Sequence, residues 1–356
     1  MNPKAHWHTS ICLTEKSNSD TAISVIAITL AIVLDFSNTY SNLFRHTLAW
    51  TAPWLMMTII FTLELKSSIE RTLMTVSTAA IIIYYVSEFS INLYFWFEAA
   101  GLPLLLSIFL LGRQPQKLEA GKYILFYVAI PRLPLLLIIL RGYWRITHLF
   151  NCLAIWVILP FLRKIPCYLL HAWLPKAHVE ASTIGSIVLA GSVIKIGRYG
   201  VLLSTPGNFM SIAIPPVLIF GVVLVGVVIL RGVDTKTLVA YSRVLHIAVG
   251  MMAWGSANFR GYAGTLFSNV AHTLLSPIMF LGVSSFYALQ GCRDRGGLRS
   301  WQRSGLCSII VCTVFLINAG MPPWILSARE VVMVLACKEK IALALGVVLG
   351  IFLSGL

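Results

Sequence analysis

The sequence predicts an all-α, polytopic membrane protein, and three observations support this prediction. Apolar residues make up 58% of the 356 residues, whereas charged residues make up only 11%. Soluble domains carry about 25% charged residues, so this chain has too little charge to cover a surface in water. The mean hydropathy is +0.84, and the apolar residues fall into long uncharged runs. Backbone polar groups in a bilayer must bond within their own segment, which favours helices.

Uncharged runs locate the expected spans in chain order. They are Thr21–Leu34, Thr47–Leu63, Thr72–Ser87, Ala99–Gly112, Ile146–Leu162, Ala181–Ile194, Tyr199–Leu230, Val244–Phe259, Gly261–Cys292, Ser304–Ala328 and Ile341–Leu356. Several runs reach the length of a span only if they include a neighbouring charge. Glu98 joins 89–97 to 99–112 in this way, and Arg132 lies within Tyr123–Leu140. We expect about 11–12 transmembrane helices, each of roughly 20 residues, with short loops between them.

Charge and cysteine content exclude several classes of function. The net charge is +14, from 27 Lys and Arg against 13 Asp and Glu. In a membrane chain this excess is typical of loops near anionic lipids such as cardiolipin. No basic stripe interleaved with aromatic residues occurs outside the apolar runs, so we expect no nucleic-acid partner. The seven cysteines contain no C-x-x-C pair, and we expect no metal site.

Glu98 is the first charge that falls inside an expected span. It lies between the aromatic residues 94–97 and the small residues 99–101. An ionisable group at mid-membrane costs about 2.5–3.5 kcal/mol and usually faces a partner or a water-filled path. We favour such a functional carboxylate over the alternative, an interfacial glutamate beneath an aromatic belt.

The segment from Lys164 to Glu180 predicts an interrupted span. Pro166 and Pro175 would break the helix and free backbone carbonyls. His171 lies two helical turns after Lys164 on nearly the same face, and His178 follows. Transporters build ion sites from discontinuous helices with ionisable side chains. The alternative is a polar loop between two ordinary helices.

Further titratable groups extend this pattern along the chain. Lys195 closes an apolar run, and a buried lysine is suited to holding and releasing a proton. His246 and His272 lie within apolar spans, where a histidine is either an ordinary core residue or part of a relay. Pro322-Pro323 interrupts another long run, and Glu330 follows seven residues later. The residues therefore predict a proton or small-cation pathway. We find no nucleotide-binding glycine motif and no H-E-x-x-H, so the energy source must lie on another subunit or in an ion gradient.

These charges occur in short motifs with a fixed order. The motifs are Phe97-Glu98 with Pro103, Gly112-Arg-Gln-Pro-Gln-Lys-Leu-Glu-Ala-Gly121, His171-Ala-Trp-Leu-Pro-Lys-Ala-His-Val-Glu-Ala181 with Gly185-Ser186, Lys195-Ile-Gly-Arg-Tyr-Gly200, Asp234-Thr-Lys236 with Ala240-Tyr-Ser242 and His246, Ala271-His272, and Met321-Pro-Pro323 with Glu330. In this order they resemble the antiporter-like membrane subunits of respiratory complex I, NADH:quinone oxidoreductase. The resemblance is strongest to the subunit 4 family of the mitochondrial enzyme, and the first seventy residues add almost nothing to it.

The resemblance implies a fold and residue roles. It implies two inverted five-helix repeats, each with a discontinuous helix, over residues 71–203 and 204–356, the second shortened at its C-terminus, after divergent transmembrane segments in 1–70. Glu98 would pair with Lys164, Lys195 would be the central lysine, and Glu330 the terminal glutamate. His246 and His272 would link them. The supporting residues would be His171, His178, Asp234 and Lys236.

The resemblance also implies a function. The chain would translocate protons in the mitochondrial inner membrane, beside other membrane-arm subunits that include neighbouring antiporter-like ones. It would carry no cofactor, because FMN, iron–sulfur clusters and ubiquinone would belong to other subunits of the NADH:ubiquinone reductase. Two alternatives stay open: a subunit of a multi-subunit cation/proton antiporter, and a structural complex I subunit that has lost pumping.

Five residues depart from the family pattern. They are Arg132, Ser182, Arg198, Arg243 and Thr273. Ser182 stands in place of a proline, Arg198 and Thr273 in place of glycines, and Arg243 in place of a serine. The added arginines bear directly on the route near Lys195. We expect Arg198 to snorkel to the interface or to pair with a carboxylate such as Glu180.

Overall fold

The computed structural model describes most of the chain from Ser68 onward. The described residues are 68–87, 91–112, 117–130, 132–141, 151–166, 168, 170–204, 215–232, 234–256, 258–290, 306–318, 320 and 325–337. The regular elements in these ranges are helices, so the all-α class is confirmed. The expected spans Thr21–Leu34, Thr47–Leu63 and Ile341–Leu356 lie outside the described residues.

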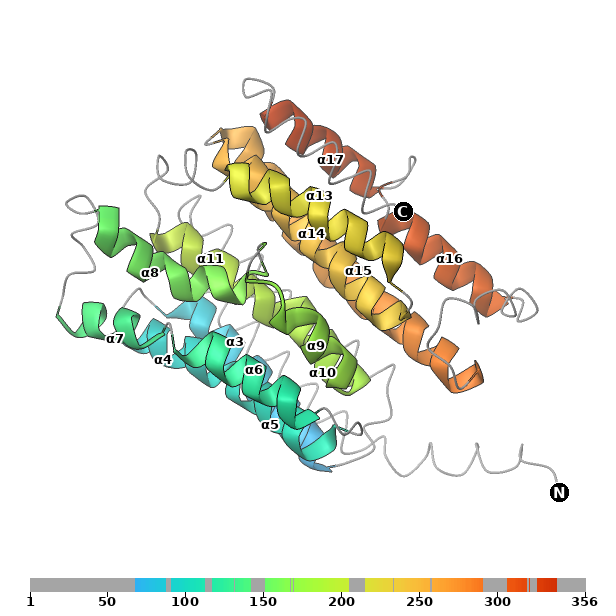
Figure 1. Ribbon diagram of the computed structural model, residues 1–356, viewed down its shortest axis with the longest axis horizontal. Coiled ribbons are helices and arrows are strands. Elements are labelled where there is room, and N and C mark those ends of the chain that lie inside the picture. Colours follow the sequence, from blue (N-terminus) through green and yellow to red (C-terminus); the bar gives the residue numbers. More distant parts are fainter. Residues whose placement is uncertain are drawn as a thin grey trace.

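The helices form two groups that follow one another along the chain. The first group is α3 (Ser68–Val86), α4 (Ile91–Ala99), α5 (Leu102–Leu111), α6 (Lys117–Ala129), α7 (Arg132–Leu140), α8 (Asn151–Lys164), α9 (Trp173–Glu180), α10 (Thr183–Val188), the π-helix η2 (Leu189–Val193) and α11 (Ile194–Ser204). The second group is α13 (Pro215–Arg231), α14 (Thr235–Gly255), α15 (Phe259–Gln290), α16 (Leu306–Asn318) and α17 (Ile325–Ala336). Helices α9 to α11 lie in the middle, between α3–α8 on one side and α13–α17 on the other (Figure 1).

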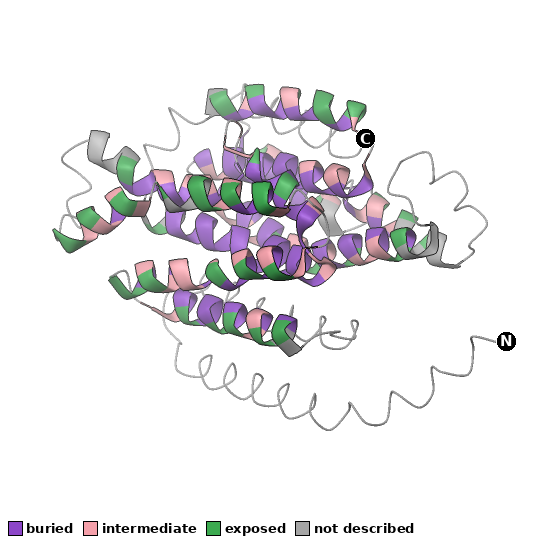
Figure 2. Ribbon diagram, turned by 60° about the horizontal axis from the view of Figure 1, so that its bottom comes forward, coloured by how far each residue is buried: buried purple, intermediate pink, exposed green. Residues whose placement is uncertain are grey.

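The outside of the bundle is apolar. Large apolar side chains are exposed on the outer helices, among them Leu106, Leu110, Phe126, Leu133, Leu137, Phe220 and Ile278. The outer helices show exposed faces and the central ones are mostly buried (Figure 2). Among the described residues, four helical stretches are long and apolar enough to cross a membrane: Ile91–Leu111, Thr183–Val201, Thr235–Gly255 and Phe259–Tyr287. An apolar exterior of this extent is suited to contact with lipid acyl chains rather than water.

The expected break after Lys164 is confirmed. Helix α8 ends at Lys164, and α9 begins only at Trp173. The Trp173 side chain donates through Nε1 to the carbonyl of Arg163 at 3.0 Å, so one carbonyl at the end of α8 has a partner. The expected role of Pro175 was wrong, because this proline lies in the first turn of α9. A proline is tolerated there, where no preceding turn supplies an acceptor for its missing N–H.

The second expected break is also confirmed. Helix α16 ends at Asn318 and α17 begins at Ile325. Gly320 lies between them with φ of 70°, a left-handed conformation that glycine adopts without steric cost. Pro322 and Pro323, from which the break was predicted, lie outside the described residues.

Two expected spans are each divided beside their charged residue. The stretch 89–112 contains α4 and α5, separated by a turn at Ala100 and Gly101, where Ser77 donates through Oγ to the Ala100 carbonyl at 2.9 Å. The stretch 123–140 is divided into α6 and α7 by a turn at Ile130. The expected span across 89–112 is confirmed, because Ile91–Leu111 is long and apolar enough to cross a membrane despite its turn. The two turns themselves were not expected. Interrupted helices place the charges at helix ends, where backbone groups are free to bond with them.

Candidate functional site

Glu98 and Lys164 lie in one cluster, but a third residue changes how they interact. Glu98, in the last turn of α4, forms an ion pair with Arg132 at the start of α7. Lys164 is 2% exposed, and its Nζ donates to the carbonyl of Phe97 at 2.7 Å. The same Nζ lies 3.7 Å from the centroid of the Phe97 ring, a cation–π contact. The expected direct ion pair between Glu98 and Lys164 was therefore wrong. The less strongly hydrated guanidinium is the better partner for a partly buried carboxylate.

A cavity connects the three charged groups of this cluster. Its volume is about 200 Å³, and Glu98, Arg132 and Lys164 line it together with mostly apolar side chains. This space is large enough for several waters, since one water needs roughly 10–15 Å³ by this measure. A water-bridged contact between Glu98 and Lys164 stays a prediction.

Lys195 is buried at the centre of the bundle, directly after the π-helix η2. Its side chain is 4% exposed, and it is the second residue of α11. Its Nζ donates to the carbonyl of Gly191 at 2.5 Å and to Oγ1 of Thr273 on α15. Thr273 in turn donates through Oγ1 to the carbonyl of Asn269 at 2.7 Å. The π-helix places a backbone carbonyl beside the ammonium, and π-helical turns often occur at functional sites.

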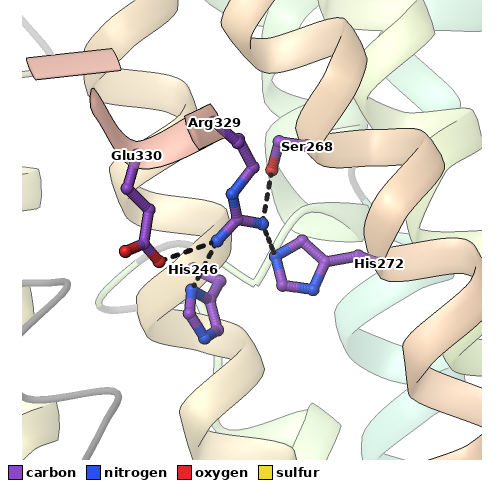
Figure 3. Close-up of polar contacts among 5 residues, drawn as sticks. All are labelled: His246, Ser268, His272, Arg329 and Glu330. Atoms are coloured by element: carbon purple, nitrogen blue, oxygen red, sulfur yellow. Dashed lines mark hydrogen bonds and ion pairs between the residues drawn. The ribbon is translucent and has the colours of Figure 1, made fainter. Parts of the chain in front are cut away.

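A third cluster consists of His246, Ser268, His272, Arg329 and Glu330, and Arg329 contacts each of the other four (Figure 3). This side chain on α17 is 2% exposed and reaches four others. Its Nη2 contacts Oε1 of Glu330 at 3.1 Å and Nδ1 of His246 at 3.4 Å. Its Nη1 contacts Nε2 of His272 at 2.6 Å and Oγ of Ser268 at 3.4 Å. The structure thus brings together His246, His272 and Glu330 as expected, but through an arginine.

Sequence reasoning missed Arg329, although a signal was present. Arg329 directly precedes Glu330 in an otherwise apolar stretch, so the cost that marks an intramembrane carboxylate applies equally to it. The rings of His246 and His272 also approach each other directly, with centroids 4.7 Å apart. Helices α14, α15 and α17 therefore converge on one polar cluster.

Two further arginines lie inside the protein. Arg198 is 7% exposed and donates through Nη1 to Oδ1 of Asn269. The expectation that Arg198 snorkels to the interface was wrong. Arg243 is 6% exposed, and its guanidinium carbon lies 4.9 Å from the centroid of the Phe280 ring. A buried charge is costly unless it is paired, so both arginines need a compensating environment.

The supporting residues lie around these clusters. His178 is fully buried and stacks on Phe280 with centroids 4.7 Å apart, and the same Phe280 ring contacts the guanidinium of Arg243. His171 lies in the break between α8 and α9 and stacks on Tyr168 at 5.7 Å. Asp234 occupies the position before α14, without a side-chain cap bond, and Lys236 is buried in the first turn of the same helix.

The arrangement places titratable side chains next to one another inside the bundle. Hydrogen-bonded titratable groups can pass protons along a chain of contacts. Lys195 contacts Thr273. His272, the residue before Thr273 in the chain, contacts Arg329, and Arg329 contacts Glu330. Within the described ranges no group of three or more His, Cys, Asp or Glu could hold a metal ion.

Comparison with known proteins places the chain among membrane subunits. The profile of a family described as "NADH:quinone oxidoreductase/Mrp antiporter, TM" matches residues 87–356. "NADH-ubiquinone oxidoreductase chain 4" of Branchiostoma lanceolatum is 32% identical over 287 residues, which cover 73% of this chain and 62% of that protein. The protein of the same name from Locusta migratoria is 35% identical over 233 residues, covering 59% and 52%. The chain thus spans less than two thirds of these relatives.

Solved structures share the fold. A chain of respiratory complex I from Thermus thermophilus with bound NADH superposes with a TM-score of 0.73 at 23% identity, over 88% of this chain and 71% of that one. A chain of the Mrp complex from Dietzia sp. DQ12-45-1b superposes with a TM-score of 0.78 at 14% identity, over 95% and 72%. At these identities the likeness establishes the arrangement of helices alone.

Proposed function

Because this chain belongs to the NADH:quinone oxidoreductase/Mrp antiporter transmembrane family, we propose that it is a proton-translocating membrane-arm subunit of respiratory complex I. The relatives named as chain 4 of NADH-ubiquinone oxidoreductase support this enzyme over an antiporter. The proposal includes the mitochondrial inner membrane as its location, other membrane-arm subunits and anionic lipids as neighbours, and NADH oxidation with ubiquinone reduction on other subunits as the driving reaction. FMN and iron–sulfur clusters would also belong to those subunits.

The observation that carries this proposal is the run of contacts from Lys195 to Glu330. The Lys195 ammonium contacts the Thr273 hydroxyl. The residue before this threonine, His272, contacts the Arg329 guanidinium, which also contacts His246 and Glu330. Lys195 would release its proton toward the histidines, because a lysine amine can act as both proton donor and proton acceptor. Arg329 would hold the imidazoles and Glu330 in place without exchanging protons itself, since arginine stays protonated in proteins.

The Glu98 cluster would act as the input of this route. Arg132 now holds Glu98, while Lys164 bonds to a backbone carbonyl across the same cavity. Movement of Arg132 away from Glu98 would leave the carboxylate to interact with Lys164 through water. An exchange of partners of this kind would change the affinity of both groups for protons.

The two breaks support the proposed division into repeats. One discontinuous helix, α8 with α9, falls within 71–203, and the other, α16 with α17, falls within 204–356. A lysine ends the first half-helix, and a glutamate lies in the second. Such pairs of interrupted helices form midplane ion sites in transporters with inverted repeats.

The test of this function is Lys195→Met in the assembled complex. Methionine has a similar length and removes a costly buried charge, so we expect assembly to be retained and the proton-to-electron ratio to fall. Lys195→Arg should fail as well, because arginine does not release its proton. The matched control is Lys176→Met, since Lys176 is exposed and pairs only weakly with Glu119 at 3.3 Å. An unchanged ratio in the Lys195→Met complex would remove this residue from the route.

A specific observation favours a second candidate, a structural subunit without pumping. The ion pair of Arg132 with Glu98 occupies the carboxylate that we expected to serve Lys164. If the chain is structural, both Lys195→Met and Glu98→Gln complexes would keep the full proton-to-electron ratio. Co-purification distinguishes the third possibility, because an antiporter subunit would purify with other transport subunits and without iron–sulfur proteins.

A further inference from the structure

A small cavity inside the bundle is lined by cationic and hydrogen-bond-donating side chains together with apolar ones. Its volume is about 20 Å³. The polar side chains that line it are Lys195, Arg198, Arg243, His246 and His272, and the rest of the lining is apolar. This volume holds a single water or a single small ion. The chemistry of the lining decides between them.

Arg243 is the first observation that points to an ion. It lines the cavity and is 6% exposed, and its Nε and Nη2 atoms are buried without a hydrogen-bond partner. Its guanidinium carbon lies over the Phe280 ring, 4.9 Å from the ring centroid. In the described part of the chain, Arg243 forms no ion pair with a carboxylate; the pairs Arg132–Glu98, Lys176–Glu119 and Arg329–Glu330 involve other arginines and lysines. An arginine cannot lose its charge in this setting.

His246 is the second, independent observation. Its Nδ1 faces the guanidinium of Arg329 at 3.4 Å, and a guanidinium only donates hydrogen bonds. In the neutral imidazole, Nδ1 is then the acceptor and Nε2 carries the hydrogen. The imidazole bonds to the backbone of Asn318. The histidine therefore adds no acceptor to the lining of the same cavity.

The other polar groups of the lining are donors as well. Lys195 already donates to two oxygens, and Arg198 donates to Asn269. His272 uses Nε2 toward Arg329, which leaves no free imidazole acceptor facing inward. A water would need acceptors for its own two hydrogens, whereas an anion accepts from every side. Positive side chains within one cavity also repel one another, and a negative charge among them removes that cost.

We propose that this cavity binds one monoatomic anion, chloride, as the counter-charge of Arg243 and the neighbouring cations. Chloride is a little larger than water and fits a space of this size, whereas sulfate and organic anions do not. The site does not depend on proton pumping, because it rests on the buried donors alone. It would hold in a structural subunit as well as in a pump.

The experiment measures thermal unfolding of the full chain, purified in detergent with the subunits that accompany it. Sodium chloride is exchanged for sodium gluconate at constant ionic strength. A ligand that binds only the folded state raises the unfolding temperature, so we expect gluconate to lower it by about 2 °C or more. Bromide should replace chloride with nearly full effect. Equilibrium binding of radioactive chloride should saturate at one ion per chain.

Three variants locate the anion. Arg243→Met and Ala190→Val should both lose saturable chloride binding and the chloride-dependent rise in unfolding temperature, the first by removing a donor and the second by filling the cavity. Ala190→Val keeps every charge, so it answers the question if Arg243→Met does not fold. The matched control is Arg231→Met, because Arg231 is exposed at the end of α13 and should leave binding intact. No saturable binding in the unaltered chain, equal binding in Arg243→Met and Ala190→Val, or loss of binding in the control would each overturn the proposal.

Discussion

The buried pair of Arg329 and Glu330 predicts an unequal response to the loss of each partner. Their side chains are 2% and 7% exposed, and the charged atoms lie 3.1 Å apart. Glu330→Gln leaves a guanidinium buried without a negative partner, a change that costs about 3–5 kcal/mol in comparable sites. Arg329→Met should cost less, about 1–3 kcal/mol, because the remaining carboxyl can take up a proton and become neutral. The arginine has no such escape.

The double variant Arg329→Met/Glu330→Gln then tests the coupling. It contains no buried charge at this position, so it should be no less stable than Glu330→Gln alone. The interaction energy from the four proteins should then be at least the cost of Arg329→Met alone, about 1–3 kcal/mol. The assay is unfolding in mixed micelles with a denaturing detergent, followed by circular dichroism, with the free energy of unfolding taken for each protein.

The exposed pair of Lys176 and Glu119 provides the control cycle. Its atoms are 3.3 Å apart, but the side chains are 45% and 60% exposed. Solvent screens such a pair, so the same cycle should give less than about 1 kcal/mol. Additive effects at Arg329 and Glu330, within about 0.5 kcal/mol, would refute the assignment of Arg329 as a charge partner.

Three further predictions follow from other parts of the structure. Arg132→Met should release Glu98, which we expect to change the proton-to-electron ratio of the assembled complex while NADH oxidation continues; an unchanged ratio would mean that the pair does not gate the route. Gly200→Ala should destabilise the chain by about 1–3 kcal/mol, because the added methyl group would overlap a buried aromatic ring, whereas Gly101→Ala, with its nearest atom at 3.7 Å, should unfold like the unaltered protein. Ser77→Ala should cost about 1–3 kcal/mol in the same unfolding assay, since it leaves a buried carbonyl at the end of α4 without its donor; a loss below a few tenths would show that water replaces the hydroxyl.

The sequence identified the costly charges but not their partners. Glu98, Lys164, Lys195 and Glu330 were found because each lies in or beside an apolar run, and the penalty for burying a charge can be read from local sequence. Their contacts depend on which helices pack together. Arg132 and Thr273 come from helices distant in the chain, and local patterning does not reveal that they reach Glu98 and Lys195.

The helix breaks show the same division between local and tertiary information. Prolines predicted breaks near Lys164–Pro175 and Pro322–Glu330, and the structure has breaks between α8 and α9 and between α16 and α17. The turn at Ala100 was missed although Pro103 lies in the first turn of α5, since the hydroxyl that bonds to the turn comes from Ser77, on another helix. Pro175 was assigned to the break although it starts the next half-helix, since a proline fits both positions locally.

The π-helix before Lys195 also sets the rotational phase of everything that follows it in that helix. A π-helical turn contains one residue more than an α-helical turn, and one residue corresponds to about 100° of rotation around the axis. Deleting one residue from Leu189–Val193 would restore a regular helix and turn the Lys195 ammonium away from Thr273 without changing any charge. The position of the lysine therefore depends on a single extra residue in the backbone. Gain or loss of that residue would form or break the contact of Lys195 with Thr273, which links α11 to α15 in the second group of helices.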